Sequence, residues 1–211
     1  MGIIHDMKEL LRGKSFGRIA MNRLLAVELA ECHGRWLDIG GGLPSYVKYL
    51  PADCSRVNTD IEPGPGATAL DADGVFPFKD DDFDGVLALN MLYIVRDPVA
   101  TLREVKRVMK MGASVVMTLP FFFPENPEPH DFHRWTREGV EKLLVDAGFR
   151  DIEISPVGGP GTAFAMSLMP GRGALVIRLC AAPWIFLWDH LDRKDPKRTC
   201  CFWLARARKI I

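Results

Sequence analysis

Trp36-Leu37-Asp38-Ile39-Gly40-Gly41-Gly42 is the stretch that decides the fold. A short apolar run with an acid near its end leads directly into three glycines. This pattern is typical of a buried parallel strand that delivers the chain into a tight turn. Open α/β sheets bind ligands beyond the carboxyl end of the first strand, where glycines let the backbone approach the ligand closely. We therefore expect a strand over 36–39 and a ligand-facing turn after it.

Asp38 narrows the choice of ligand. A carboxylate directly before the turn would repel the pyrophosphate of a dinucleotide, but it would attract the ammonium of an amino-acid moiety such as that of S-adenosylmethionine. A nicotinamide-dependent oxidoreductase would also be expected to carry a glycine where Ser45 stands. The stretch thus favours a methyl-donor site over a hydride-cofactor site.

The chain around this stretch alternates between strand and helix patterns as far as residue 155. Apolar periodicity, glycine stops and the N-cap residues Asp97 and Thr136 predict this alternation. The predicted strands cover 36–39, 55–59, 67–70, 83–89, 113–119, 150–155 and 199–205, and the predicted helices cover 16–31, 45–50, 98–110 and 136–147. Such persistent alternation predicts a parallel, doubly wound α/β sheet.

Acids follow the predicted strands at more than one place. Asp60 ends the second strand about 20 residues past the glycines, the separation at which a βαβ unit presents an acid to ribose hydroxyls. Asp71 follows the third strand. Each acid alone could be a turn or cap residue. Their coincidence at successive strand ends favours a shared ligand site.

Composition limits the partners and the compartment. Lys plus Arg and Asp plus Glu both number 27, so the net charge of +0 provides no basic field for nucleic acid. The five cysteines are odd in number and form no C-x-x-C pair, which fits reduced thiols in a cytoplasm. The first twelve residues lack the apolar core of a secretory signal. We expect a cytoplasmic protein with a small-molecule partner and no nucleic-acid partner.

The ordered motifs resemble the class I S-adenosylmethionine-dependent methyltransferases, especially the group labelled methyltransferase type 11. The resemblance covers roughly 34–155 and rests on the segments 37–42, 59–61, 71–78, 83–84 and 102–112. It implies a Rossmann-like, doubly wound, mostly parallel seven-stranded sheet. The last strand would be antiparallel. The resemblance also implies methyl transfer from S-adenosylmethionine. The apolar stretch before the last strand lies outside the resemblance. We expect it to be a helical insertion, and its apolar side chains favour a small, partly apolar acceptor.

We expect a single methyltransferase domain over 1–211. Its parts would be an N-terminal helical segment (1–33), a cofactor-binding core (34–157), an apolar lid or packing segment (158–198), and a final strand with a basic tail (199–211). Arg172 and Arg178 interrupt the apolar run of the third part, so it falls short of the roughly 20 apolar residues that span a bilayer. Packing on the sheet, a dimer face, a lid and a membrane-surface contact stay open for it.

The resemblance implies a set of cofactor contacts, carried over by position. Asp38 and the glycine turn would hold the methionine part, the second strand end the ribose, and Asp71 the adenine, with Asp73 as its competitor. Asn90 or Leu92 would line the reacting end. The implied contacts are Asp38, Gly40, Gly41, Gly42, Asp60, Ile61, Asp71, Ala72 and Asn90.

His130, Asp131 and His133 follow the fifth predicted strand, beside the expected acceptor site. If the acceptor must lose a proton, one of them could act as general base. The alternatives are that Asp131 pairs with Arg134 and that the histidines are exposed loop residues. No cysteine or carboxylate cluster completes a metal site around them, so we expect no metal.

A different class of function stays open beside the enzyme. The chain could be a non-catalytic nucleotide-binding regulator or scaffold that keeps the methyltransferase fold. The strand-end acids at Asp38 and Asp60 disfavour this alternative. The sequence specifies neither the acceptor atom nor the oligomeric state.

Overall fold

The computed structural model describes residues 3–41, 45–62, 64–126, 129–168, 175–191 and 199–210. Within these ranges the strands form one seven-stranded sheet in the order β3-β2-β1-β4-β5-β7-β6. Neighbours from β3 to β5 are parallel, and β7 is antiparallel to both β5 and β6. The predicted fold class is therefore confirmed. The strands are β1 (Gly34–Ile39), β2 (Cys54–Asp60), β3 (Thr68–Ala69), β4 (Phe83–Leu89), β5 (Met109–Pro120), β6 (Arg150–Val157) and β7 (Phe202–Arg208).

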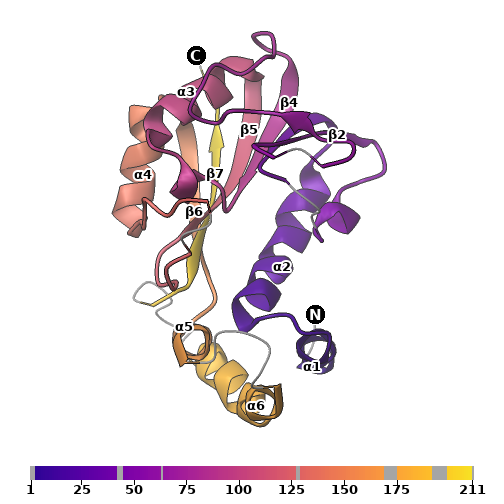
Figure 1. Cartoon of the computed structure of the whole chain (residues 1–211), viewed down its shortest axis with the longest axis vertical. Coiled ribbons are helices and arrows are strands. Elements are labelled where there is room, and N and C mark those ends of the chain that lie inside the picture. Colours follow the sequence, from indigo (N-terminus) through magenta and orange to yellow (C-terminus); the bar gives the residue numbers. More distant parts are fainter. Residues whose placement is uncertain are drawn as a thin grey trace.

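Helices cover both faces of the sheet and one of its ends. Figure 1 shows α3 and α4 on one side of the sheet and α2 on the other, with α1, α5 and α6 beyond the lower end. The helices are α1 (Ile3–Leu11), α2 (Phe16–Glu28), α3 (Pro98–Val108), α4 (Arg137–Asp146), α5 (Pro160–Leu168) and α6 (Leu175–Leu191). Short 3-10 turns cover Leu29–Glu31, Val47–Tyr49 and Leu92–Ile94. The antiparallel β7 begins at this lower end, so the parallel strands end there and present their carboxyl edge to α5.

Side-chain caps fix where the central helices begin. The Asp97 carboxylate accepts the Ala100 N–H at 3.0 Å, and the Thr136 hydroxyl accepts the Gly139 N–H at 3.1 Å. Both caps match the sequence prediction and satisfy backbone donors that the first turn leaves without partners. The predicted end of α3 at residue 110 is wrong. Met109 pairs with Phe83, so β5 takes over the chain directly after Val108.

The sheet has an apolar cluster on each face, and a third cluster joins α1, α2, α5 and α6. The layer formed by α5 and α6 is held together by polar contacts as well. Asp189 of α6 accepts the backbone N–H of Thr162 at 3.1 Å and also binds its hydroxyl. α6 also carries exposed apolar side chains, of which Trp188 lies beside Phe164 of α5. They are Ile177, Trp184, Leu187, Trp188 and Leu191. No described helix has the length and hydropathy of a membrane span.

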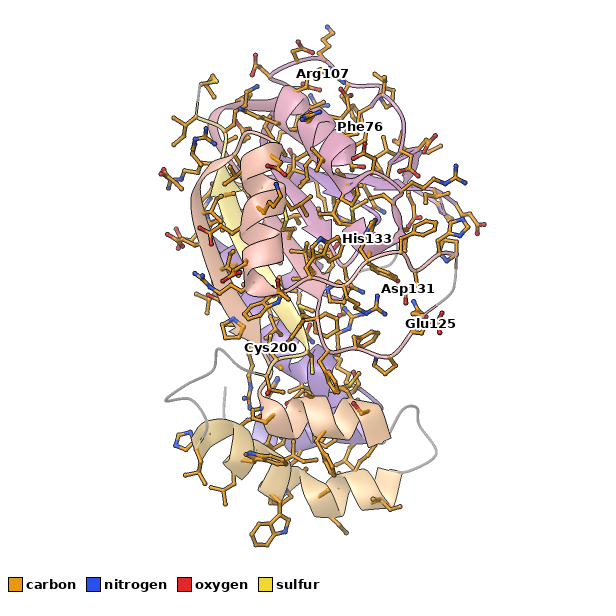
Figure 2. All side chains as sticks on the ribbon, turned by 90° about the vertical axis from the view of Figure 1, so that its left-hand side faces the viewer. Phe76, Arg107, Glu125, Asp131, His133 and Cys200 are labelled. Atoms are coloured by element: carbon orange, nitrogen blue, oxygen red, sulfur yellow. The ribbon has the colours of Figure 1, made fainter. Side chains whose placement is uncertain are left out.

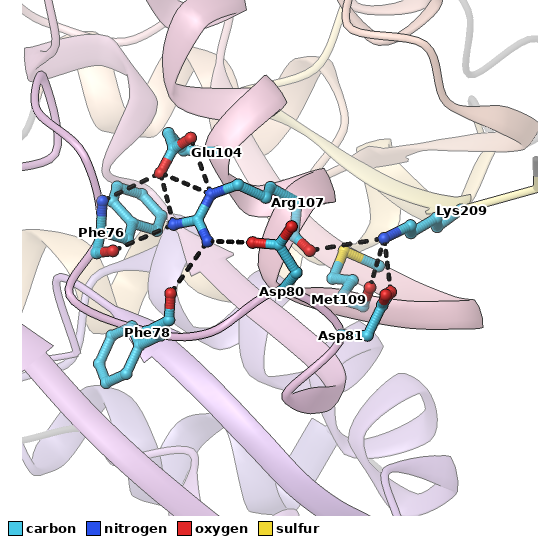
Figure 3. Close-up of polar contacts among 8 residues, drawn as sticks. All are labelled: Phe76, Phe78, Asp80, Asp81, Glu104, Arg107, Met109 and Lys209. Atoms are coloured by element: carbon cyan, nitrogen blue, oxygen red, sulfur yellow. Dashed lines mark hydrogen bonds and ion pairs between the residues drawn. The ribbon is translucent and has the colours of Figure 1, made fainter.

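Arg107, in the last turn of α3, anchors the segment 76–82 at the amino-terminal edge of the parallel strands. Its guanidinium donates to Glu104 at 2.8 Å, to Asp80 at 2.6 Å, and to the carbonyls of Phe76 and Phe78 at 3.0 and 2.9 Å (Figure 3). Figure 2 places Arg107 and Phe76 at the end of the molecule opposite α5 and α6. The contacts hold the return from β3 to β4 against α3, far from the carboxyl edge.

Candidate functional site

A cavity of about 660 Å³ opens at the carboxyl edge of the sheet. We call it the larger cavity. Its lining comes from α2 and the residues just before it, from the turn after β1 with Ser45 and Tyr46, from the ends of β4 and β5 with Phe123, and from single residues of α5 and β7. A volume between about 300 and 1,000 Å³ is typical of sites for small molecules and cofactors.

Asp38 lies beneath the glycine turn. Its side chain is fully buried, and Tyr46 donates its hydroxyl to both carboxylate oxygens at 2.9 and 2.7 Å. Arg56 of β2 donates to the same carboxylate at 2.5 Å. Burial raises the pKa of Asp38, whereas the hydrogen bonds from Tyr46 and Arg56 lower it. Burial and the adjacent carboxylate raise the pKa of Tyr46, which keeps its phenol protonated as a donor.

The turn itself is fixed by backbone and packing. The N–H groups of Gly40 and Gly41 donate to the Thr59 carbonyl at 2.9 and 3.1 Å. A Cβ atom at Gly41 would stand 2.6 Å from a carboxylate oxygen of Asp38 and 2.3 Å from the side-chain oxygen of Asn58, so a side chain is excluded there. Asp38 and Asn58 thus fill the space beside Gly41, whereas Gly40 and Gly41 line the larger cavity with backbone alone. Gly42, which was predicted to contribute, lies outside the described residues.

The sequence missed the protein partners of Asp38. It predicts a carboxylate that faces the ligand, but both oxygens bind protein groups in this structure, and Asp38 does not line the larger cavity. An available signal was Arg56, a cation within a predicted strand, where charged residues are rarely buried without a partner. The direct contact with an ammonium stays a prediction.

A second cavity of about 170 Å³ gathers several residues predicted to hold ribose and adenine. Ile61, Asp71, Ala72 and Asp73 line it together. Asp71 accepts the Asp73 N–H at 3.0 Å, and Asp73 accepts the Arg96 N–H at 2.9 Å. Asp60 lies at the end of β2, half-buried, and one of its oxygens accepts the Glu62 N–H at 3.4 Å.

The three general-base candidates have different partners in the structure. His133 donates from Nε2 to the Val95 carbonyl at 2.9 Å. Asp131 accepts the Asn126 N–H at 2.7 Å and pairs with Arg134, whose hydrogen bonds hold the pKa of that carboxyl below its usual range. Figure 2 shows His133 and Asp131 on the loop beside the sheet.

His130 lines the smaller cavity and stacks on Phe132 with ring centroids 5.2 Å apart. None of the three candidates lines the larger cavity among its described residues. The contacts support Asp131 as an anchor of its loop, which is the alternative that the sequence left open. A general-base role for any of them stays a prediction.

Asn90 and Leu92, the two residues predicted to line the reacting end, lie in different surroundings. Asn90 lines the larger cavity with a positive φ of 56°, and its N–H donates to the Thr118 carbonyl at 3.1 Å. Leu92 is fully buried in the apolar cluster under α3, so its predicted place at the reacting end is wrong. The chain reverses after Asn90, and the 3-10 turn Leu92–Ile94 carries that side chain into the core.

Sequence reasoning also missed the contribution of α2. Lys14, Ser15 and Arg18 line the mouth of the larger cavity, and Thr118 lines its floor. The helix was predicted, but its packing against the carboxyl edge depends on contacts between segments far apart in the chain. For the floor of the cavity a signal was available, because Thr118 is a polar residue near the end of a predicted strand.

Comparison with known proteins confirms the predicted resemblance. A family model described as methyltransferase domain matches residues 37–117. An uncharacterized protein of Methanocaldococcus jannaschii is 26% identical over 136 residues, which are 57% of this chain and 66% of that protein. The chain thus spans slightly less than two thirds of the length of this relative.

Solved structures share the fold at low sequence identity. A structure described as an S-adenosylmethionine-dependent methyltransferase from Archaeoglobus fulgidus matches with a TM-score of 0.63 and 16% identity, covering 99% of this chain and 100% of that one. A phosphoethanolamine N-methyltransferase of Haemonchus contortus, in complex with S-adenosylmethionine, matches with a TM-score of 0.58 and 14% identity. That match covers 90% of this chain and 52% of the other.

Proposed function

We propose that this chain is an S-adenosylmethionine-dependent methyltransferase that transfers a methyl group to a small, partly apolar molecule bound in the larger cavity. The match of residues 37–117 to a methyltransferase-domain model and the shared fold support this proposal. The observation that carries the proposal is the continuity of that cavity. It joins the glycine turn and Asn90 to apolar walls formed by α2, α5 and β7. The reacting end of the donor would therefore lie in the same cavity as the acceptor, while its ribose and adenine would extend towards the smaller cavity.

The residues present fit the cofactor that the family implies. Gly40, Gly41 and Gly42 would hold the methionine part, supported from beneath by Asp38. Asp60 and Ile61 would meet the ribose, Asp71 and Ala72 the adenine, and Asn90 the reacting end. Gly40, Gly41 and Asn90 line the larger cavity, whereas Ile61, Asp71 and Ala72 line the smaller one, which supports this assignment.

When bound, S-adenosylmethionine supplies an activated methyl group on a sulfonium. The chain's contribution is then to hold the acceptor in line with that methyl and to exclude water, because much of the barrier to such a displacement can be removed by positioning. Apolar walls and a floor of buried strand ends serve this purpose. An acceptor that is already nucleophilic needs no general base, which fits the absence of His130, Asp131 and His133 from the described lining of this cavity.

We further propose that 1–211 acts as one domain in the cytoplasm. The parts would be the N-terminal helical segment (1–33), the core (34–157), the apolar segment (158–198) and the final strand and tail (199–211). Contacts of α5 with α2 and of α6 with α1 support a packed segment at the carboxyl edge. Met166 of α5 lines the larger cavity, so this segment would also help to enclose the acceptor.

Calorimetric titration with S-adenosylhomocysteine tests the donor site. We expect saturable binding by the parent chain and a loss of at least tenfold, about 1.4 kcal/mol, in Asp38→Ala and in Asp60→Ala. Asp53→Ala, which removes an exposed carboxylate that contacts His33, is the matched control and should bind like the parent.

No binding by the parent would contradict the proposal. Tight binding of NAD in its place would favour an oxidoreductase. Binding of S-adenosylhomocysteine without methyl transfer to any acceptor in a broad screen would favour the regulator or scaffold.

A further inference from the structure

The larger cavity extends past the residues proposed to hold the cofactor. Gly40, Gly41 and Asn90 lie at the ends of β1 and β4, whereas Thr118 and Phe202 come from β5 and β7. The strand order β2-β1-β4-β5-β7 places the last two strands on the side away from the proposed ribose and adenine contacts. This part of the cavity is therefore available to the acceptor, and its chemistry indicates what the acceptor carries.

Thr118 provides a buried polar group at the floor. Its side chain is 1% exposed, and its hydroxyl oxygen has no hydrogen-bond partner among the described residues. Along β5, Thr118 shares a face with Val116, which packs in the same apolar cluster as Leu25 of α2. The hydroxyl therefore lies on the α2 side of the sheet, where the cavity is. A buried hydroxyl without a partner is costly, so a ligand group at this floor would restore the missing hydrogen bond.

Arg18 provides a cation at the mouth. It lies exposed in the first turn of α2, where its backbone N–H donates to the Ser15 hydroxyl at 3.2 Å. Lys14, the other cation of the lining, is bound to Glu9, but no ion pair of the described residues involves Arg18. The described lining holds no carboxylate, and the N-terminus of the 13-residue α2 adds its dipole at the same place. The mouth thus favours an anion.

Apolar side chains form one part of the wall, and Ser45 and Tyr46 belong to the rest of it. Met21 and Leu25 face the cavity from α2, Met166 from α5, and Phe123 from the segment after β5. Phe123 packs on Phe202 with ring centroids 4.9 Å apart. Methionine and aromatic side chains of this kind accommodate an alkyl or aromatic body of variable shape.

We propose that the acceptor is an amphipathic acid. Arg18 binds its carboxylate or phosphate at the mouth, its apolar body lies along Met21, Leu25 and Met166, and the Thr118 hydroxyl bonds a polar group at the floor. The identity of this ligand as the methyl acceptor rests on the proposed function, but the anion-binding site can be measured without it.

The test is calorimetric titration of the full chain, with and without S-adenosylhomocysteine, using octanoate, octyl phosphate and octanol as probes. We expect at least one acidic probe to bind ten or more times more tightly than octanol, and the tighter of the two identifies carboxylate or phosphate. Arg18→Gln should weaken the acidic probe tenfold or more and leave octanol unchanged. Arg137→Gln, which removes the same charge from α4, is the matched control.

The floor is tested with 8-hydroxyoctanoate. This probe should bind more tightly than octanoate, and Thr118→Val, which preserves the shape of the side chain, should abolish the difference. Equal binding of both probes by the parent overturns the role of Thr118.

Two results overturn the anion site. One is octanol binding as tightly as the acids. The other is an Arg18→Gln variant that loses as much affinity for S-adenosylhomocysteine as for octanoate, because Arg18 would then serve the donor. If the acids bind through Arg18 and S-adenosylhomocysteine does not bind, the proposed function fails and the anion site stands. If S-adenosylhomocysteine binds and no acid is preferred, the acceptor class alone fails.

Discussion

Two acids that look equivalent in the sequence have different surroundings in the folded protein. Asp38 and Asp60 both belong to the ends of neighbouring parallel strands, and both are predicted to meet the same ligand. Asp38 is buried under the glycine turn with Arg56 and Tyr46, whereas Asp60 is half-buried and its carboxylate accepts only the Glu62 N–H among the described contacts. Residue type and spacing predicted that both acids lie at strand ends. The burial and the hydrogen-bond partners of each acid depend on side chains from other parts of the chain that the fold places beside it.

The two acids should therefore differ in their effect on stability. Asp38→Ala leaves the mostly buried Arg56 without its carboxylate, so we expect it to lower the free energy of unfolding by about 3 kcal/mol. Asp60→Ala should change it by no more than about 0.5 kcal/mol. Urea unfolding followed by circular dichroism measures both. An Asp38→Ala variant as stable as the parent would contradict the buried ion pair.

Glu9 supplies a pH-dependent contribution at the junction of α1 and α2. Its carboxylate binds Lys14 and accepts from Arg12 at 2.7 Å, and these hydrogen bonds lower its pKa from 4.5 to about 2. A lowered pKa in the folded state stabilises the fold above the unfolded value, and this contribution is lost as the pH falls from about 4.5 to about 2.

Glu9→Gln should accordingly lower the free energy of unfolding by about 1–3 kcal/mol at pH 7. The difference from the parent should shrink as the pH is taken down from 4.5 towards 2. Denaturant unfolding at a series of pH values measures it, with the exposed Glu138→Gln as the control that should follow the parent throughout. A difference that does not vary with pH would show that Glu9 acts through packing alone.

At the scale of elements, local patterns predicted the strands and central helices because burial periodicity and caps are local signals. Asp97 and Thr136 begin their helices as predicted. The predicted bounds of elements are wrong where contacts between segments far apart in the chain determine the structure. Met109 joins β5 through its partner Phe83 on β4, and the predicted helix over 45–50 shortens to the 3-10 turn Val47–Tyr49.

The candidate site likewise has a part that local sequence patterns predict and a part that they do not. The glycine turn and the strand-end acids were predictable, because each follows a strand with a clear pattern. The lining from α2 and α5 was not, because nothing within Gly13–Arg18 or near Met166 specifies which sheet edge those segments cover. Tertiary packing across more than a hundred residues of chain decides it.

Arg107 should be the principal anchor of the segment 76–82. Arg107→Met removes donors to two carboxylates and two carbonyls, so we expect a loss of about 2–4 kcal/mol in the free energy of unfolding. In this variant the rate of amide hydrogen exchange should rise in 76–82 more than in the rest of the protein. Arg103→Met is the matched control, since its guanidinium donates a single long bond of 3.4 Å to the Asp146 carbonyl. Uniformly faster exchange would contradict a local anchor.

The whole molecule consists of a helix-covered sheet and a further helical layer at its carboxyl edge (Figure 1). The larger cavity lies where α2, α5 and the strand ends meet. Gly17 of α2 sets the spacing at this junction, because a Cβ atom there would lie 3.3 Å from the Met166 sulfur and 3.4 Å from the Phe202 ring. A larger side chain would occupy the space that we assign to the acceptor.

Gly17→Leu should therefore block the acceptor and leave the donor site intact. We expect binding of S-adenosylhomocysteine within about twofold of the parent and a loss of at least tenfold for octanoate, with a stability cost of about 1–3 kcal/mol from overpacking. Gly17→Ala adds one carbon next to a flexible methionine and is the control for size. This variant should bind both S-adenosylhomocysteine and octanoate like the parent. Equal loss of both ligands in Gly17→Leu would mean that the two sites are not separate.

The tryptophans of α6 are exposed and the other tryptophans are buried, so the protein has two distinct fluorescence signals. Trp184 and Trp188 are 73% and 47% exposed, whereas Trp36, Trp135 and Trp203 are 3%, 9% and 3% exposed. Acrylamide should quench the long-wavelength emission of the α6 indoles and spare the blue-shifted emission of the three buried indoles, which lie in β1, in β7 and just before α4. The intrinsic fluorescence can thus report on the helical layer and on the sheet core in one titration, without a label.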